Sequence, residues 1–129
     1  MNRSDITSKE DVVLLVDSFY KRAICDESIG PFFTKVSPIN LDEHKPILYS
    51  FWESVLFYTG SYRGNPMETH VRIHQKSALE KHHFDTWLRL WKNTIEDLFE
   101  GEKAKEAIGK STQIAGLMQH HIGNRNGNK

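Results

Sequence analysis

The sequence lacks the features that membrane, secreted and nucleic-acid-binding proteins usually show. Its 129 residues include one cysteine, Cys25, so no disulfide can form within the chain, and a reducing compartment is expected. Lysine plus arginine (17) equals aspartate plus glutamate (17), which gives no electrostatic case for binding nucleic acid or an anionic membrane. No apolar run is long enough to span a bilayer, and the polar N-terminus lacks a signal-peptide core. We therefore expect one cytoplasmic domain over residues 1–122 and a disordered polar tail over 123–129.

Motifs for common enzyme chemistry are also scarce. There is no glycine-rich phosphate loop, and most carboxylates are scattered over polar faces. His70 and His74 are four residues apart and would share one helix face, where they could hold a metal ion. However, Val71 stands where a zinc-hydrolase helix has glutamate, and there are no cysteine pairs. A histidine-bound metal is therefore kept only as an alternative.

The sequence does contain four long segments with helical periodicity. In each segment, apolar residues recur at spacings of three and four, and no segment alternates as a strand would. The segments cover about residues 8–26, 40–60, 82–100 and 102–122. Thr7 with Glu10, and Asn40 with Glu43, fit capping boxes at the first two starts. The pattern predicts an all-α domain.

Proline and glycine are few, and they interrupt these segments at definite places. Pro46 cannot donate a backbone hydrogen bond, so the second helix should kink or restart there and leave His44 on an irregular turn. The run 29–31 (Ile-Gly-Pro) should end the first helix. Phe32 and Phe33 would then lie in a loop, where they could plug the core or line a ligand pocket.

A short helix is predicted to present His70. Asn65 is a good N-cap, Pro66 suits the first helical position, and Glu68 falls three residues after the cap. The segment carries little apolar surface of its own. We therefore expect that its role is to hold His70 towards a pocket built by the rest of the chain.

Aromatic residues are abundant, with seven Phe, four Tyr and three Trp. Tyr20, Trp87 and Trp91 fall on buried helix faces, so the polar atom of each needs a partner. A pocket for haem, held by one axial imidazole, fits this pattern. A helical binding module with an aromatic core fits it too, with the Tyr20 hydroxyl bonded to a backbone carbonyl. The residues alone leave both possibilities open.

Five runs of residues stand in a characteristic order and spacing. They are Phe19-Tyr20; Asp26-x-x-Ile29-Gly30-Pro31-x-Phe33; Glu43-His44-Lys45 ahead of Phe51-Trp52; Tyr62-x-Gly64-Asn65-Pro66 ahead of His70; and His83-Phe84-x-x-Trp87-Leu88-x-Leu90-Trp91. In this order the chain resembles the third group of truncated haemoglobins, from about Val12 to about Met118. Glycine pairs that mark helix ends in the other truncated groups are not evident, which agrees with the third group. The resemblance implies a shortened globin fold, with two helices over two around haem b.

The same resemblance assigns roles to individual residues. His70 matches the proximal iron ligand, Tyr20 and Trp87 match distal hydrogen-bond donors, and His44 matches a distal histidine that acts as a gate. Leu48 matches the apolar distal residue one turn further on. The other residues that we assign to the cofactor are Phe33, Phe51, Trp52, His74, Phe84, Ile114 and Met118.

The implied function is reversible binding of O2 and of other diatomics such as NO and CO. Two donors in a dry pocket predict high O2 affinity and slow release, which suits O2 scavenging, NO dioxygenation or peroxidase-like chemistry better than transport. The chain has no flavin or nicotinamide module, so turnover would need an external reductase. We expect a monomer. The alternatives are a haem-independent helical module and a haem-based sensor, although no output domain is evident.

Overall fold

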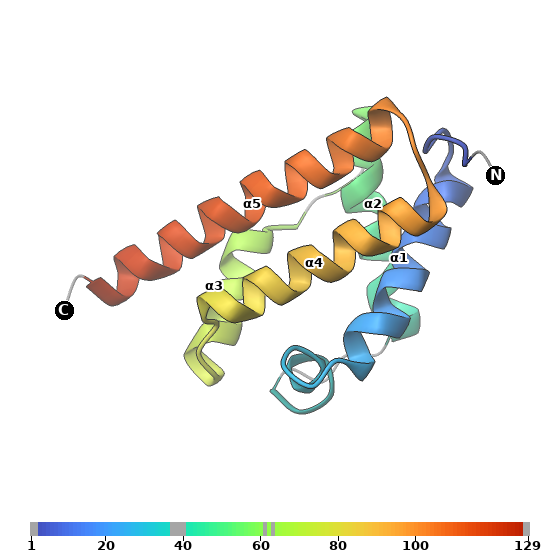
Figure 1. Cartoon of the computed structure of the whole chain (residues 1–129). Helices are drawn as coiled ribbons and strands as arrows, with labels where there is room; N and C mark the ends of the chain where they lie inside the picture. Colours follow the sequence, from blue (N-terminus) through green and yellow to red (C-terminus); the bar gives the residue numbers. More distant parts are fainter. Residues whose placement is uncertain (1–2, 37–40, 61, 63, 128–129) are drawn as a thin grey trace.

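The computed structural model describes residues 3–36, 41–60, 62 and 64–127, and within these ranges every regular element is helical. The elements are α1 (Lys9–Cys25), the π-helical turn η1 (Phe32–Val36), α2 (Leu41–Phe57), α3 (Pro66–Lys76), α4 (Lys81–Leu98) and α5 (Glu102–Gly127). The predicted all-α class is therefore confirmed (Figure 1). No helix in the described ranges is both long and apolar enough to cross a membrane.

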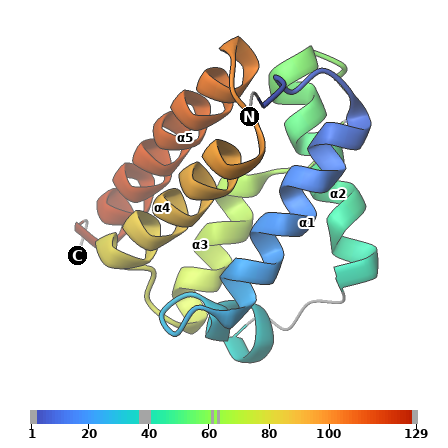
Figure 2. The same cartoon turned by 45° about the vertical axis from the view of Figure 1, so that its right-hand side comes forward.

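The four long helices form two pairs. α1 packs on α2, α4 packs on α5, and α1 joins the pairs through its contacts with α4 (Figure 2). This is the two-over-two arrangement that the family resemblance implies. The short helix α3 packs on α5 and on η1, and it starts at Pro66 as expected. Its position places His70 beside the two pairs instead of inside either one.

The apolar core is divided into two clusters. The larger one joins α1, α2, α4 and the start of α5, and in it Trp91 is 4.6 Å from Trp52 and 5.3 Å from Phe19 between ring centroids. The smaller one lies between α4 and α5 and consists of Phe84, Ala115, Met118 and Ile122, with partly buried neighbours. The predicted inward faces of α1, α4 and α5 are confirmed. Ile47 of α2 is apolar but 51% exposed.

The N-terminus of α1 corrects one predicted cap. Ser8 is the N-cap, because its hydroxyl oxygen accepts a hydrogen bond from the Asp11 backbone N–H at 3.3 Å. The Asp11 carboxylate in turn accepts from the Thr7 backbone N–H at 2.9 Å. The capping interaction thus lies one residue later than the predicted pair of Thr7 with Glu10. The second predicted cap cannot be compared, since Asn40 lies outside the described residues.

Pro46 does not break α2. The helix is continuous from Leu41 to Phe57, so the predicted restart is wrong and His44 lies on a regular helix. Pro46 falls in the second turn, where its missing N–H removes one hydrogen bond, to the Asp42 carbonyl, and leaves the rest of the ladder intact.

The Phe pair after α1 also lies in regular structure. Phe32 and Phe33 belong to η1, although the sequence predicts a loop. Gly30 makes this possible, because a Cβ at that position would collide with the Ile24 carbonyl oxygen at the end of α1. Such a close approach between neighbouring segments is not visible in hydrophobic periodicity.

The end of α5 corrects the predicted end of the last helix. α5 continues past Ile122 to Gly127, through part of the segment expected to be a disordered tail. Extending an existing helix fixes one residue for each hydrogen bond gained, whereas starting a helix fixes several residues for the first one. Polar, glycine-containing residues that could not start a helix can therefore continue one.

Gly101 is needed where the N-terminal segment contacts the start of α5. The Asp5 carboxylate accepts from the backbone N–H groups of Lys103 and Ala104, each at 2.9 Å. Gly101 has φ = 135°, and a Cβ there would overlap the Asp5 side chain. We expect Gly101→Ala to lower the free energy of unfolding, measured in urea, by about 1–3 kcal/mol. The control Gly109→Ala, in an open helical position, should raise it slightly, and equal effects would contradict this account.

Candidate functional site

His70 is partly buried near the start of α3, in a fixed tautomer. Its Nδ1 is 2.7 Å from the Pro66 carbonyl oxygen, which can only accept, so Nδ1 carries the hydrogen and donates. Nε2 is left with its lone pair and bonds to no described residue. Burial lowers the pKa of His70 although the hydrogen bond to Pro66 opposes this, so the imidazole stays neutral at pH 7. A neutral imidazole oriented through Nδ1 is the form that binds a metal ion.

His44 lies close to His70 from the opposite helix, α2. Burial and the nearby charge of protonated His70 both lower the pKa of His44. Its ring is perpendicular to that of Tyr20, with 6.1 Å between centroids. The fold therefore brings two of the predicted histidines and the predicted tyrosine to one region, bordered by α1, α2 and α3.

Tyr20 has a hydroxyl with no hydrogen-bond partner among the described residues. The side chain is 6% exposed, and its ring packs edge-on against Phe19 and Phe33. The alternative that this hydroxyl bonds to a backbone carbonyl is therefore wrong within the described ranges. Burial raises the pKa of Tyr20 well above 10, so the group remains a donor. A hydroxyl without a protein partner can donate a hydrogen bond to a ligand.

The two tryptophans of α4 have different surroundings. Trp91 is buried in the larger cluster, and its indole N–H donates to the Ala107 carbonyl at 3.4 Å. Trp87 is only partly buried, and its indole N–H has no acceptor among the described residues. Phe19 lies against both Tyr20 and Trp87, with 5.5 and 5.6 Å between centroids. Trp91 is thus a core residue, and Trp87 retains a free donor near Tyr20.

The other predicted contact residues, except His74, belong to the two apolar clusters. Phe33, Leu48 and Phe51 are partly buried at the edge of the larger cluster, whereas Phe84, Ile114 and Met118 belong to the smaller one. Trp52 stacks on Trp91 within the core. His74 accepts a hydrogen bond at Nδ1 from the Leu79 backbone N–H at 2.9 Å, which ties the end of α3 to the following loop.

Sequence reasoning did not assign Phe19 or Tyr62 to the site. Phe19 contacts both Tyr20 and Trp87, and Tyr62 packs edge-on against Phe51 with 5.1 Å between centroids. The helical period does place Phe19 on the buried face, and its position next to Tyr20 was an available signal. Tyr62 follows α2, where periodicity gives no information about contacts.

The side chains of this site can be compared with the protein ligands that zinc and haem each require. A histidine-bound metal such as zinc needs three or more protein ligands, and no group of three His, Cys, Asp or Glu residues suited to a metal occurs among the described residues. Haem needs only one axial protein ligand, since the porphyrin supplies the other nitrogens. One neutral imidazole with a free Nε2, two donors without protein partners, and apolar rings on both sides fit haem.

Three histidines in low-polarity surroundings predict a loss of stability in acid. Burial lowers the pKa values of His44, His70 and His83 below the ordinary 6.5. Because the unfolded chain then binds more protons, stability falls as the pH drops through 6.5 towards the folded pKa values. We expect the free energy of unfolding of the cofactor-free chain in urea to decrease from pH 7 to pH 5. In a chain that carries both His44→Gln and His70→Gln, the free energy of unfolding should decrease less between these pH values. An equally large decrease would show that the titrating groups lie elsewhere.

Comparison with known proteins points the same way. The sequence profile of the bacterial-like globin family matches residues 4–122. The chain is 24% identical over 118 residues to the group 3 truncated hemoglobin ctb of Campylobacter jejuni, covering 89% of this chain and 91% of that protein. The crystal structure of group III truncated hemoglobin from Campylobacter jejuni matches with a TM-score of 0.81 and 22% identity, over 93% of this chain and 94% of that one. Chlamydomonas reinhardtii THB1 matches with a TM-score of 0.71 and 24% identity, over 87% and 90% of the two chains.

These matches cover nearly the whole folded chain and confirm the resemblance to third-group truncated haemoglobins that the motifs predict. The oriented imidazole of His70 and the unpartnered hydroxyl of Tyr20 are independent of that likeness and fit it. The chain therefore belongs to the bacterial-like globin family, whose members are haem-binding globins.

Proposed function

We propose that the protein binds haem b through Nε2 of His70 and binds O2, NO or CO on the opposite side, beside Tyr20. The observation that carries this proposal is the imidazole of His70, whose Nδ1 is committed to Pro66 while Nε2 has no partner among the described residues. Haem b, when bound, would supply the iron that binds a diatomic ligand. The apolar residues assigned to it lie in both core clusters.

Tyr20 and Trp87 act as donors to the diatomic ligand. The hydroxyl of Tyr20 stays protonated because burial raises its pKa, and the indole N–H of Trp87 has no competing acceptor in the described chain. His44 stays neutral because burial and His70 lower its pKa. A neutral imidazole can form a hydrogen bond either with Tyr20 or with the ligand. Donors in such a dry site hold a ligand with partial negative charge more strongly than they would in water.

Tight binding with slow release supports O2 scavenging, NO dioxygenation or peroxidase-like chemistry over transport. Sustained redox turnover consumes electrons, and in this proposal a separate reductase supplies them. We also propose a cytoplasmic monomer, for which the single cysteine and the balanced charge are the support.

A haem titration of the purified chain tests this function. We expect a Soret band that saturates at about one haem per chain, with separate spectra for the ferric, ferrous, O2-bound and CO-bound forms. The exposed His120 provides a control, since His120→Ala should leave each spectrum unchanged. A stable, colourless protein that does not respond to added haem would instead support the haem-independent helical module.

A further inference from the structure

Three tryptophan rings form a continuous stack that begins at the proposed ligand site and enters the core. Trp87 and Trp91, one turn apart on α4, are nearly parallel, with 5.8 Å between centroids and 12° between planes. Trp91 stacks in turn on Trp52 of α2, at 4.6 Å and 26°. Trp87 is partly buried, whereas Trp91 and Trp52 are buried. All three tryptophans of the sequence therefore belong to one stack.

The stack continues through Phe51 to Tyr62. The ring of Phe51 is edge-on to Trp52 at 5.3 Å and to Tyr62 at 5.1 Å between centroids. Tyr62 is partly buried, and its hydroxyl lies beside the exposed Gly64, where a Cβ would overlap it. Burial raises the pKa of Tyr62, so its hydroxyl keeps its proton at pH 7. We call these five residues the aromatic row: Trp87, Trp91, Trp52, Phe51 and Tyr62.

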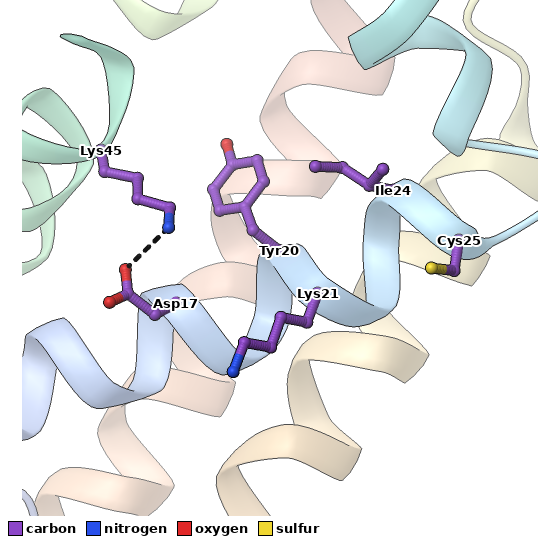
Figure 3. A pocket seen from close by; sticks show the side chains of 6 residues that line it. All are labelled: Asp17, Tyr20, Lys21, Ile24, Cys25 and Lys45. Atoms are coloured by element: carbon purple, nitrogen blue, oxygen red, sulfur yellow. Dashed lines mark ion pairs between the residues drawn. The ribbon is translucent and has the colours of Figure 1, made fainter. Parts of the chain in front are cut away.

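Tyr20 lies to one side of the aromatic row. Its ring is edge-on to Phe19, which also contacts Trp87 and Trp91. Tyr20 lines a pocket of about 360 Å³ between α1 and the start of α2 (Figure 3). The other residues that line this pocket are Asp17, Lys21, Ile24, Cys25 and Lys45. None of them belongs to the row, so Tyr20 is a second oxidisable side chain near the ligand site that a test has to tell from Tyr62.

We propose that the aromatic row carries single electrons from Tyr62 to the ligand site, where they reduce bound hydrogen peroxide, and that small phenols supply these electrons at Tyr62. The inference rests on the proposed haem function, and in its peroxidase-like reaction the phenol takes the place of the separate reductase. Tryptophan and tyrosine lose one electron more readily than phenylalanine does. Rings in contact divide the distance from the ligand site to Tyr62 into short steps, and Phe51 bridges the last one without being oxidised.

The electrons and protons of this reaction balance. Hydrogen peroxide takes up two electrons and two protons, its O–O bond breaks, and it leaves as two water molecules. Each electron comes from Trp87, which is reduced again by Trp91, and Trp91 by Trp52. Tyr62 then reduces Trp52 and releases its hydroxyl proton to water. A phenol returns one electron and one proton to Tyr62 and becomes a phenoxyl radical, so two phenols are consumed for each peroxide.

The hydrogen-bond partner of Trp91 keeps the transferred charge mobile. Its indole N–H donates to the Ala107 carbonyl at 3.4 Å. A peptide carbonyl is too weak a base to take the proton of an oxidised indole, so Trp91 keeps that proton and can be reduced again at once. An oxidised phenol is a strong acid and loses its proton to water. The charge is therefore held at Tyr62, where an external phenol can reach it beside Gly64.

Pulse radiolysis of the haem-free chain tests the aromatic row without the cofactor. The azide radical takes one electron from tryptophan and becomes azide, and Trp87 is the most accessible of the three. We expect the tryptophanyl absorption to decay as the tyrosyl absorption rises, at a rate independent of protein concentration. In Tyr62→Phe the yield of tyrosyl radical should fall several-fold. The matched control Tyr58→Phe removes an exposed tyrosine outside the row and should keep the yield.

Two outcomes of this comparison would overturn the proposal. One is an equal yield of tyrosyl radical in Tyr62→Phe and Tyr58→Phe, which would place the oxidised tyrosine outside the row. The other is a rate that rises in proportion to protein concentration, because the electron would then pass between molecules and not along the row.

In the haem-loaded protein, the row should determine which side chain becomes oxidised. With one equivalent of hydrogen peroxide and no phenol, a nitroso spin trap located by mass spectrometry should label Tyr62. Trp91→Phe interrupts the row, so labelling of Tyr62 should fall several-fold while labelling of Trp87 or Tyr20 rises. Trp52→Phe interrupts the row at the next ring and should have the same effect. Undiminished labelling of Tyr62 in both variants would overturn the proposal.

The two proposals fail in distinguishable ways. If the chain binds no haem, the proposed function fails at the titration, and pulse radiolysis still decides whether the row conducts electrons. If haem binds but the yield of tyrosyl radical does not depend on Tyr62, haem binding stands and the row is only apolar core. Circular dichroism of each variant verifies that the helical fold is retained.

Discussion

Replacing His70 by glycine is expected to lower the affinity of the protein for haem by at least about 100-fold. His74, the other histidine of α3, uses Nδ1 to accept from Leu79 and lies one turn further along the helix, so it is not oriented as His70 is. The Soret band at equal haem concentration should therefore be weaker and shifted. Titration of the haem-free chain, followed by absorption, measures both changes.

Added imidazole provides an internal check on this result. The cavity left by His70→Gly can accept free imidazole, so millimolar imidazole should restore much of the band if the defect is the missing ligand. The matched variant His74→Ala removes a histidine from the same helix and should reduce haem affinity far less. An unaltered spectrum in His70→Gly, or an equal loss in both variants, would show that His70 is not the axial ligand.

Tyr20→Phe is expected to raise the O2 dissociation rate constant by about 10- to 100-fold. The substitution removes one hydroxyl donor from a buried site, where a hydrogen bond to a charged or strongly polar group is worth about 1.5–3 kcal/mol. Trp87→Phe should act in the same direction, because the indole N–H of Trp87 has no other acceptor in the described chain. Stopped-flow displacement of O2 by CO measures the rate in each variant.

The same Tyr20 variant makes a second, independent prediction about stability. Because the Tyr20 hydroxyl bonds to no described residue, its removal should leave the free energy of unfolding of the haem-free chain unchanged or slightly higher. If the hydroxyl were instead bonded to a backbone carbonyl, Tyr20→Phe would lower it by about 1 kcal/mol. Faster O2 release with an undiminished free energy of unfolding identifies Tyr20 as a donor to the ligand. A lower free energy of unfolding with unaltered O2 release would instead assign Tyr20 to the core.

The sequence alone predicted the number and approximate limits of the long helices and the residues on their buried faces. Periodicity succeeds here because burial of a helix face depends on spacing within a single element. The motifs around Tyr20, His44, His70 and Trp87 also pointed to the family that the comparisons confirm. The continuous helix through Pro46, the later cap at Ser8 and the π turn at Phe32 were missed. Each depends on the balance of a few backbone hydrogen bonds, which residue type specifies only weakly.

Only the tertiary structure decided what each buried polar group contacts. Periodicity places Tyr20, Trp87 and Trp91 on inward faces alike, but Trp91 has the Ala107 carbonyl of another helix as its acceptor, and Tyr20 and Trp87 have none in the described chain. Likewise, Asp17 gives no signal in the sequence, because its partners Lys45 and Tyr49 are brought to it by the packing of α2 on α1. The sequence therefore determined which side chains are buried, while the packing of distant segments determined which of them remain available to a ligand.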